Sequence, residues 1–245
     1  MIDLSPIKNK KIGLVCSGGV AKAAAWHLGV ALALEDMGLT FKHNGSPTAK
    51  NEKSDLEIGT YVGSSAGAMI GIYLANGYGP HDVINATLNM NEQLFPAFTY
   101  KDMFTIKRVK SGKVKKGLYS PFEGIPPVVK KLLNPLSGIS GFFSTSGISN
   151  YLREHIILSE NFNDYAADLF IVASQLDNSR KVIFGKYNYP NPSHDDTAHY
   201  YTGISVVDAA CASMAVPIFY SPHPIQNPVT KEIEYYIDAE VRETL

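Results

Sequence analysis

The chain has 245 residues, of which 45% are hydrophobic and 18% charged, as in an ordinary globular protein. Its formal net charge of −1 argues against a protein that binds nucleic acid over its whole surface, since such proteins are usually basic. The length suits one large domain, and no stretch approaches the roughly 20 uninterrupted apolar residues that a membrane-spanning helix needs.

The first half of the chain predicts two strand–turn–helix units in succession. Residues 11–16 (KIGLVC) form a short apolar run that predicts a buried strand, and the strong helix formers of 21–38 predict a helix with a glycine at its end. After a polar stretch at 42–55, a second strand is expected at 56–62 and a second helix at 66–77. This repetition favours an α/β domain with a parallel sheet.

The N-terminus also has the basic-then-apolar order of a secretory signal peptide. Ser17, Gly18, Gly19 and Lys22 interrupt the apolar run early, so we do not expect a cleaved signal. The expected location is therefore cytoplasmic, with contact to a membrane surface and secretion by a signal-less route both left open.

The second half predicts more strands and one further helix. Strand-like runs occupy 169–177 and 181–187, small residues predict a helix at 205–217, and a last strand is expected at 232–238. Without repeats or low-complexity tracts, residues 1–245 are expected to form a single domain. Buried free thiols are expected for the two cysteines, which both lie in apolar surroundings: Cys16 and Cys211.

Residues 93–145 differ in character from the rest. Between Lys101 and Lys131, nine basic residues stand against two acidic ones, and aromatic residues are interleaved with them. One interpretation is a solvated cap with ordinary surface lysines. The other is a lid over the substrate groove that contacts anionic lipid, because basic and aromatic side chains both favour such a surface. The basic cluster expected to make this contact is Lys113, Lys115 and Lys116.

A turn with the pattern G-x-S-x-G follows the second predicted strand and has Ser65 at its centre. A sharp turn there strains the central residue and makes its hydroxyl project, which suits a nucleophile. The turn requires glycine at both flanking positions, Gly63 and Gly67, because side chains there would collide with the neighbouring strand and helix. A plain glycine-rich turn is the alternative, and Ser64, which lacks the glycine frame, is the weaker candidate nucleophile.

A glycine-containing loop, SGGVAKA at 17–23, links the first predicted strand to the first helix. Gly18 and Gly19 allow backbone N–H groups to face a ligand without obstruction, and Lys22 could orient the loop or pair with negative charge. The loop is a poor nucleotide site, because G-x-G-x-x-G is incomplete and no G-K-[ST] follows.

Asp238 is the strongest candidate for a general base. It ends the last predicted strand, where its carboxylate is expected at the same sheet edge as Ser65, although a turn-initiating aspartate is the alternative. None of the seven histidines lies in a motif, and Asp208 with His223 is the pair available to a histidine-dependent esterase of the α/β-hydrolase type. We expect no metal or cofactor, because no ligand cluster has a recognisable spacing.

These three features, in this order, resemble the patatin-like phospholipases. The family has a glycine-rich loop followed by Lys or Arg, then G-x-S-x-G, then Asp followed by Gly or Ala, and the segments 169–185 and 212–222 also look like family segments. The resemblance covers most of 11–240 and leaves 41–55 and 93–145 poorly matched.

The resemblance implies a three-layer α/β/α fold with a mostly parallel central sheet and a helical or irregular lid. It also implies a Ser65–Asp238 dyad without histidine, and an oxyanion hole made by the N–H groups of Gly18 and Gly19, with Val20 as a candidate third donor. The implied substrate is a phospholipid or another acyl-ester lipid, reached by peripheral contact with a membrane. No nucleic-acid partner is implied, and no oligomeric state is indicated.

Two features depart from the family pattern. Val20 stands where a small residue is usual and Ala23 where Gly is usual, so the alternative is a catalytically weak or inactive lipid-binding or regulatory module. Asp238 also lies seven residues from the last residue, whereas family members usually continue further, which is the pattern expected of a fragment.

Overall fold

The computed structural model describes residues 3–44, 54–106, 141, 143–176, 180–187 and 198–241. The predicted membrane-contact lysines Lys113, Lys115 and Lys116 lie outside the described residues, as does most of the predicted insert. No helix in the described ranges is both long enough and apolar enough to cross a membrane.

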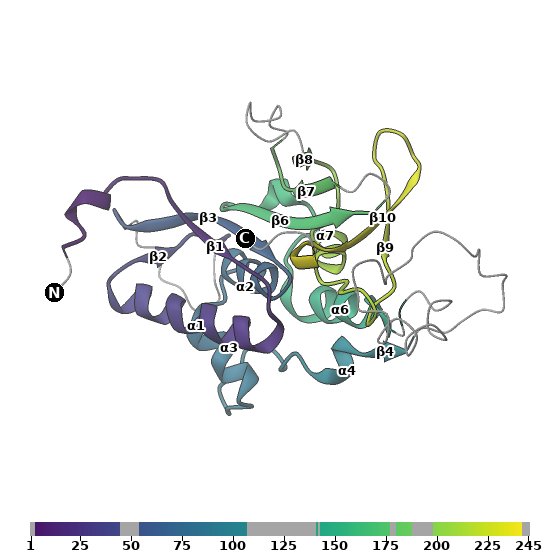
Figure 1. The fold of residues 1–245 in the computed structure, drawn as a ribbon. Helices are drawn as coiled ribbons and strands as arrows, with labels where there is room; N and C mark the ends of the chain where they lie inside the picture. Colours follow the sequence, from purple (N-terminus) through teal and green to yellow (C-terminus); the bar gives the residue numbers. More distant parts are fainter. Residues whose placement is uncertain are drawn as a thin grey trace, which may run out of the picture.

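Among the described residues, eight strands form one mixed sheet at the centre of the molecule (Figure 1). Strands β1, β2, β3 and β6 run parallel to one another, whereas β7 and β10 are antiparallel to β6. The strands are β1 (Ile12–Cys16), β2 (Thr40–Phe41), β3 (Glu57–Ser64), β6 (Asp168–Gln175), β7 (Arg180–Phe184), β8 (Ala198–Tyr201), β9 (His223–Gln226) and β10 (Ile233–Asp238).

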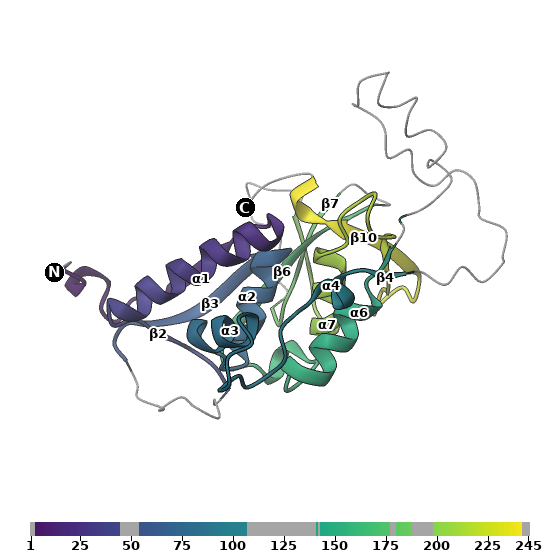
Figure 2. The ribbon, with the colours of Figure 1, turned by 90° about the horizontal axis from the view of Figure 1, so that it is seen from below.

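Helices flank this sheet, and Figure 2 shows α1, α2 and α3 packed side by side. Helices α2 and α7 lie against the central strands β3 and β6. The helices are α1 (Val20–Asp36), α2 (Ala66–Ala75), α3 (Pro80–Thr87), α4 (Tyr100–Met103), α6 (Ser146–Tyr151) and α7 (Val206–Ser213). The predicted α/β class with a mostly parallel central sheet is thus confirmed.

The core lies between the sheet and these helices. All ten residues of α2 are buried, because this apolar helix packs on both β3 and α1. Small residues fill α7, which lets its backbone approach β6 closely. Cys16 and Cys211 are free and buried as predicted, and burial raises the pKa of the Cys211 thiol to about 12.

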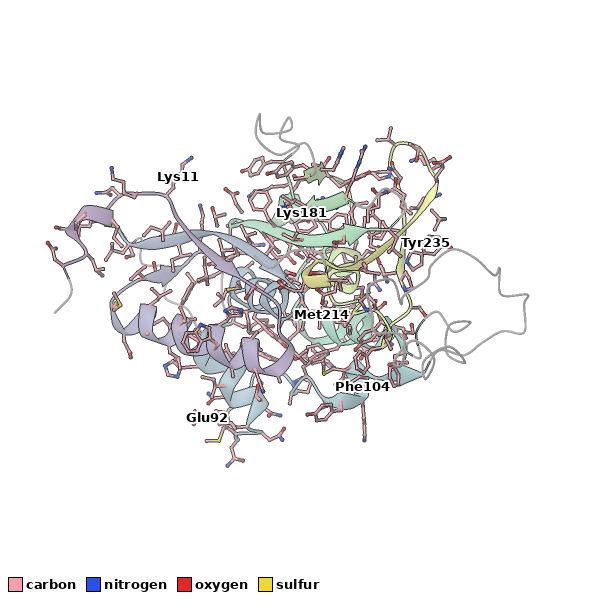
Figure 3. All side chains as sticks on the ribbon, in the orientation of Figure 1. Lys11, Glu92, Phe104, Lys181, Met214 and Tyr235 are labelled. Atoms are coloured by element: carbon pink, nitrogen blue, oxygen red, sulfur yellow. The ribbon has the colours of Figure 1, made fainter. Side chains whose placement is uncertain are left out.

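The described ends of the predicted insert are joined by a small antiparallel pair, β4 (Thr105–Ile106) with β5 (Phe143–Ser144). Several aromatic residues of the predicted insert pack on the body of the protein. Phe95 is buried in the core, and Phe104, labelled in Figure 3, packs at 4.9 Å between ring centroids against Phe143. Phe143 in turn contacts Tyr220, so this end of the insert is anchored to the segment that follows α7.

Candidate active site

Strand β6 brings Ser65 and Asp238 together. Ser64, the last residue of β3, pairs with Val172, and Asp238, the last residue of β10, pairs with the adjacent Ala173. Strand β7 occupies the other edge of β6 over the same residues, so β3 and β10 lie on one edge and meet end to end. The turn at Ser65 therefore lies beside the Asp238 carboxylate.

The direction of β10 departs from the parallel sheet that the sequence favours. Because β10 is antiparallel to β6, it also runs opposite to β3. If the two strands lay side by side, the carboxyl end of β10 would lie at the far end of the sheet from Ser65. It reaches Ser65 because β3 stops at Ser64 and leaves the rest of the β6 edge free for β10.

The backbone at Ser65 has the geometry of a nucleophile turn. Its φ of 51° and ψ of −118° lie in a region that residues with a side chain rarely adopt, and α2 begins at the next residue. A Cβ at Gly63 would lie 2.5 Å from the Ala68 backbone, and one at Gly67 would lie 2.1 Å from the Cys16 carbonyl oxygen. Both positions of the motif are therefore restricted to glycine by the following helix and by β1.

Asp238 is a buried carboxylate with two partners. It accepts a hydrogen bond of 2.9 Å from the Glu240 N–H, and the Ser65 hydroxyl lies close enough to lower its pKa. Burial raises its pKa above the usual 3.8, an effect that the Ser65 hydroxyl and the Glu240 N–H reduce and the nearby Glu240 charge increases. A carboxylate that holds a proton more readily than usual is suited to accept one from serine.

The glycine loop faces the same point. The Gly18 N–H donates a hydrogen bond of 2.8 Å to the Glu240 carboxylate, and a Cβ at Gly18 would lie 3.0 Å from the Ser65 Cβ. A donor beside the nucleophile thus already holds an anionic oxygen, near the N-termini of α1 and α2. His27 Nε2 donates a hydrogen bond of 2.8 Å to the Ser17 carbonyl, since a carbonyl oxygen can only accept, and this bond holds the loop.

The other loop residues lie at the start of α1. Gly19 precedes the helix with a φ of 132°, which favours glycine, and the exposed Lys22 and half-buried Ala23 lie in the first turn. Val20 has a φ of 56°, a left-handed conformation that is strongly disfavoured for a β-branched side chain. Val20, which departs from the family pattern, therefore has a strained backbone.

Val20→Gly is expected to stabilise the protein. The substitution removes about 1–3 kcal/mol of strain, offset by about 0.5–1 kcal/mol of chain entropy, and it loses little packing because the side chain is 55% exposed. The control is Ala21→Gly in the same turn, which is expected to destabilise by up to about 1 kcal/mol. Denaturant unfolding of the wild type and the two variants measures both effects. Equal destabilisation by Val20→Gly and Ala21→Gly would contradict backbone strain at Val20.

Asp208 and His223 do meet, but at another place. His223 Nε2 lies 3.4 Å from Asp208 Oδ1, and His223 Nδ1 lies 2.8 Å from the Thr145 hydroxyl. Both ring nitrogens are thus engaged, and neither makes a hydrogen bond to Ser65. Within the described ranges, no group of three or more His, Cys, Asp and Glu side chains is placed to hold a metal ion.

Two residues of this site were not singled out from the sequence. Glu240 follows the Asp-Ala motif directly, and its proximity to Asp238 is the signal that could have found it. Ser213 lies at the end of α7, where its hydroxyl accepts a hydrogen bond of 2.8 Å from the Ser65 N–H. It falls in the segment 212–222, which resembles a family segment but contains no motif that predicts a role in the site.

A comparison with known protein families covers all of these motifs. The family model described as patatin-like phospholipase matches residues 14–245, nearly the whole chain. A comparison with curated proteins gave no match.

Proposed function

The chain belongs to the patatin-like phospholipase family. We propose that it is a lipid acyl hydrolase that cleaves the fatty-acyl esters of phospholipids, with Ser65 as the nucleophile. The observation that carries this proposal is the meeting of β3 and β10 on one edge of β6. It places a strained serine beside a buried carboxylate whose pKa is raised.

In the first step, Asp238 takes the hydroxyl proton of Ser65 as the serine oxygen attacks the ester carbonyl. The carbon–oxygen ester bond then breaks, the alcohol leaves with a proton from Asp238, and the acyl group stays on Ser65. A water molecule gives a proton to Asp238 and attacks the carbonyl carbon of this acyl-enzyme. The bond between that carbon and the Ser65 oxygen breaks, Asp238 returns the proton to the Ser65 oxygen, and the fatty acid is released.

The negative charge that develops on the carbonyl oxygen needs backbone donors nearby. Gly18 is assigned as one donor, because its N–H already faces a carboxylate oxygen beside Ser65. Gly19 and Val20 are the further donors that the loop offers. The N-termini of α1 and α2 favour the same charge.

The Glu240 carboxylate must leave Gly18 before a substrate oxygen can take its place. Ser65 is only 6% exposed and Asp238 only 2%, so the described arrangement is a covered site. Contact with a membrane surface, through the basic cluster Lys113, Lys115 and Lys116, remains part of this proposal as the route by which lipid arrives.

The experiment is to incubate the purified chain with vesicles of phosphatidylcholine and phosphatidylglycerol and to measure free fatty acid and lysophospholipid by mass spectrometry. The wild-type chain is expected to release both. Glu240→Ala is expected to raise kcat/KM about tenfold, because it frees a donor held by a charged hydrogen bond.

Glu232→Ala is the matched control, because it removes the same charge from an exposed position near the start of β10. It is expected to leave the rate unchanged. Absence of fatty acid with both the wild type and Glu240→Ala would contradict a hydrolase. It would favour instead the catalytically silent lipid-binding module, which the strain at Val20 and the occupied Gly18 N–H would then explain.

A further inference from the structure

Ser213 is fully buried at the C-terminal end of α7, directly behind the Ser65 turn. Its hydroxyl oxygen accepts a hydrogen bond of 2.8 Å from the Ser65 N–H and its hydroxyl hydrogen is donated to the Val172 carbonyl at 2.6 Å. The hydroxyl therefore both accepts a hydrogen bond, from the turn that follows β3, and donates one, to β6.

The bond to Ser65 satisfies a donor that the turn itself cannot satisfy. Ser65 is the residue before α2, so its N–H has no partner within the helix. An unpaired N–H at this buried position would favour a relaxed turn in which the serine side chain points elsewhere.

The same short segment also holds the base. The Asp238 N–H donates a hydrogen bond of 3.1 Å to the carbonyl of Ala215, two residues after Ser213. Met214, which lies between them, is labelled near the middle of the molecule in Figure 3. The end of α7 thus binds the backbones of the nucleophile and of the base, and sets their separation.

We propose that Ser213 is a positioning residue for catalysis, which holds Ser65 in its strained conformation at a fixed distance from Asp238. This inference rests on the proposed function of Ser65 and Asp238. It predicts that loss of the Ser213 hydroxyl impairs the chemical step and leaves lipid binding intact.

The test compares Ser213→Ala with Ser64→Ala. Ser64 is also fully buried and adjoins the nucleophile, but its hydroxyl finds no hydrogen-bond partner in the described part of the chain. Ser213→Ala is expected to lower kcat for vesicle hydrolysis about ten- to a hundredfold with KM unchanged, and to slow labelling by a fluorophosphonate probe by the same factor. Ser64→Ala is expected to stay within about twofold of the wild type.

Amide hydrogen exchange at Ser65, measured by NMR well below the melting temperature, reports on the same bond without any substrate. Exchange is expected to be at least about tenfold faster in Ser213→Ala and unchanged in Ser64→Ala. Wild-type kcat, labelling rate and exchange rate in Ser213→Ala would overturn the inference. Wild-type protein that is neither labelled nor active would overturn the proposed function and with it the catalytic role of Ser213, even where exchange confirms the bond.

Discussion

Ser65→Ala is expected to lower kcat for phospholipid hydrolysis about 10⁶-fold, the loss typical of removing a serine nucleophile. The fold should survive, because the bond from residue 65 to Ser213 uses the backbone N–H and not the side chain. Alanine also keeps the Cβ, so the strain of the left-handed turn is unchanged. Fatty-acid release from vesicles measures the rate, and circular dichroism verifies the fold.

The control is again Ser64→Ala, which removes the neighbouring buried hydroxyl and should leave the rate near that of the wild type. Comparable losses in the two variants would mean that the turn, and not the Ser65 hydroxyl, limits the reaction. Residual hydrolysis at the wild-type rate in Ser65→Ala would place the nucleophile elsewhere.

Asp238→Asn is expected to lower kcat about 10²–10⁴-fold, the range that general base catalysis contributes. The amide keeps the shape of the side chain and can still accept the Glu240 N–H, but it cannot take a proton from Ser65. Wild-type hydrolysis should rise with pH as Asp238 ionises, with a midpoint above 3.8 because burial raises its pKa. This limb should be absent from the pH profile of Asp238→Asn, and its persistence would assign it to another group.

The same substitution should raise stability at neutral pH. The folded protein binds the proton of this carboxyl more strongly than the unfolded chain does, because the pKa is higher in the folded state. The contribution of Asp238 to stability therefore falls as the pH rises from 3.8 through the folded-state pKa. Asp238→Asn is therefore expected to melt at a higher temperature than the wild type at pH 7. The difference should shrink as the pH approaches 3.8, and a constant difference would contradict a buried charge.

Much of the fold, and the residues of the candidate site, could be proposed from local patterns. The helices at 21–38 and 66–77 are shifted by one or two residues at their ends, and the last strand ends at Asp238 as expected. Strand–turn–helix order and glycine spacing depend on neighbouring residues, so they can be read from the sequence.

The rest depends on contacts between distant residues. The direction of β10 is set by the free edge of β6, which follows from where β3 stops and has no local signal. The bond from Ser213 to Ser65 spans 148 positions, and that from Gly18 to Glu240 spans 222. Neither serine nor glutamate carries a periodicity that predicts such a partner, so tertiary packing alone identifies them.

The most direct test of the account is to identify the residue that a fluorophosphonate probe modifies, by mass spectrometry of peptides from the labelled wild-type chain and its Glu240→Ala variant. The account predicts a single modified residue, Ser65, with faster labelling once Glu240 is removed from the Gly18 N–H. Modification of Ser64, or of Thr145 beside His223, would contradict it. So would the absence of any modified serine in Glu240→Ala.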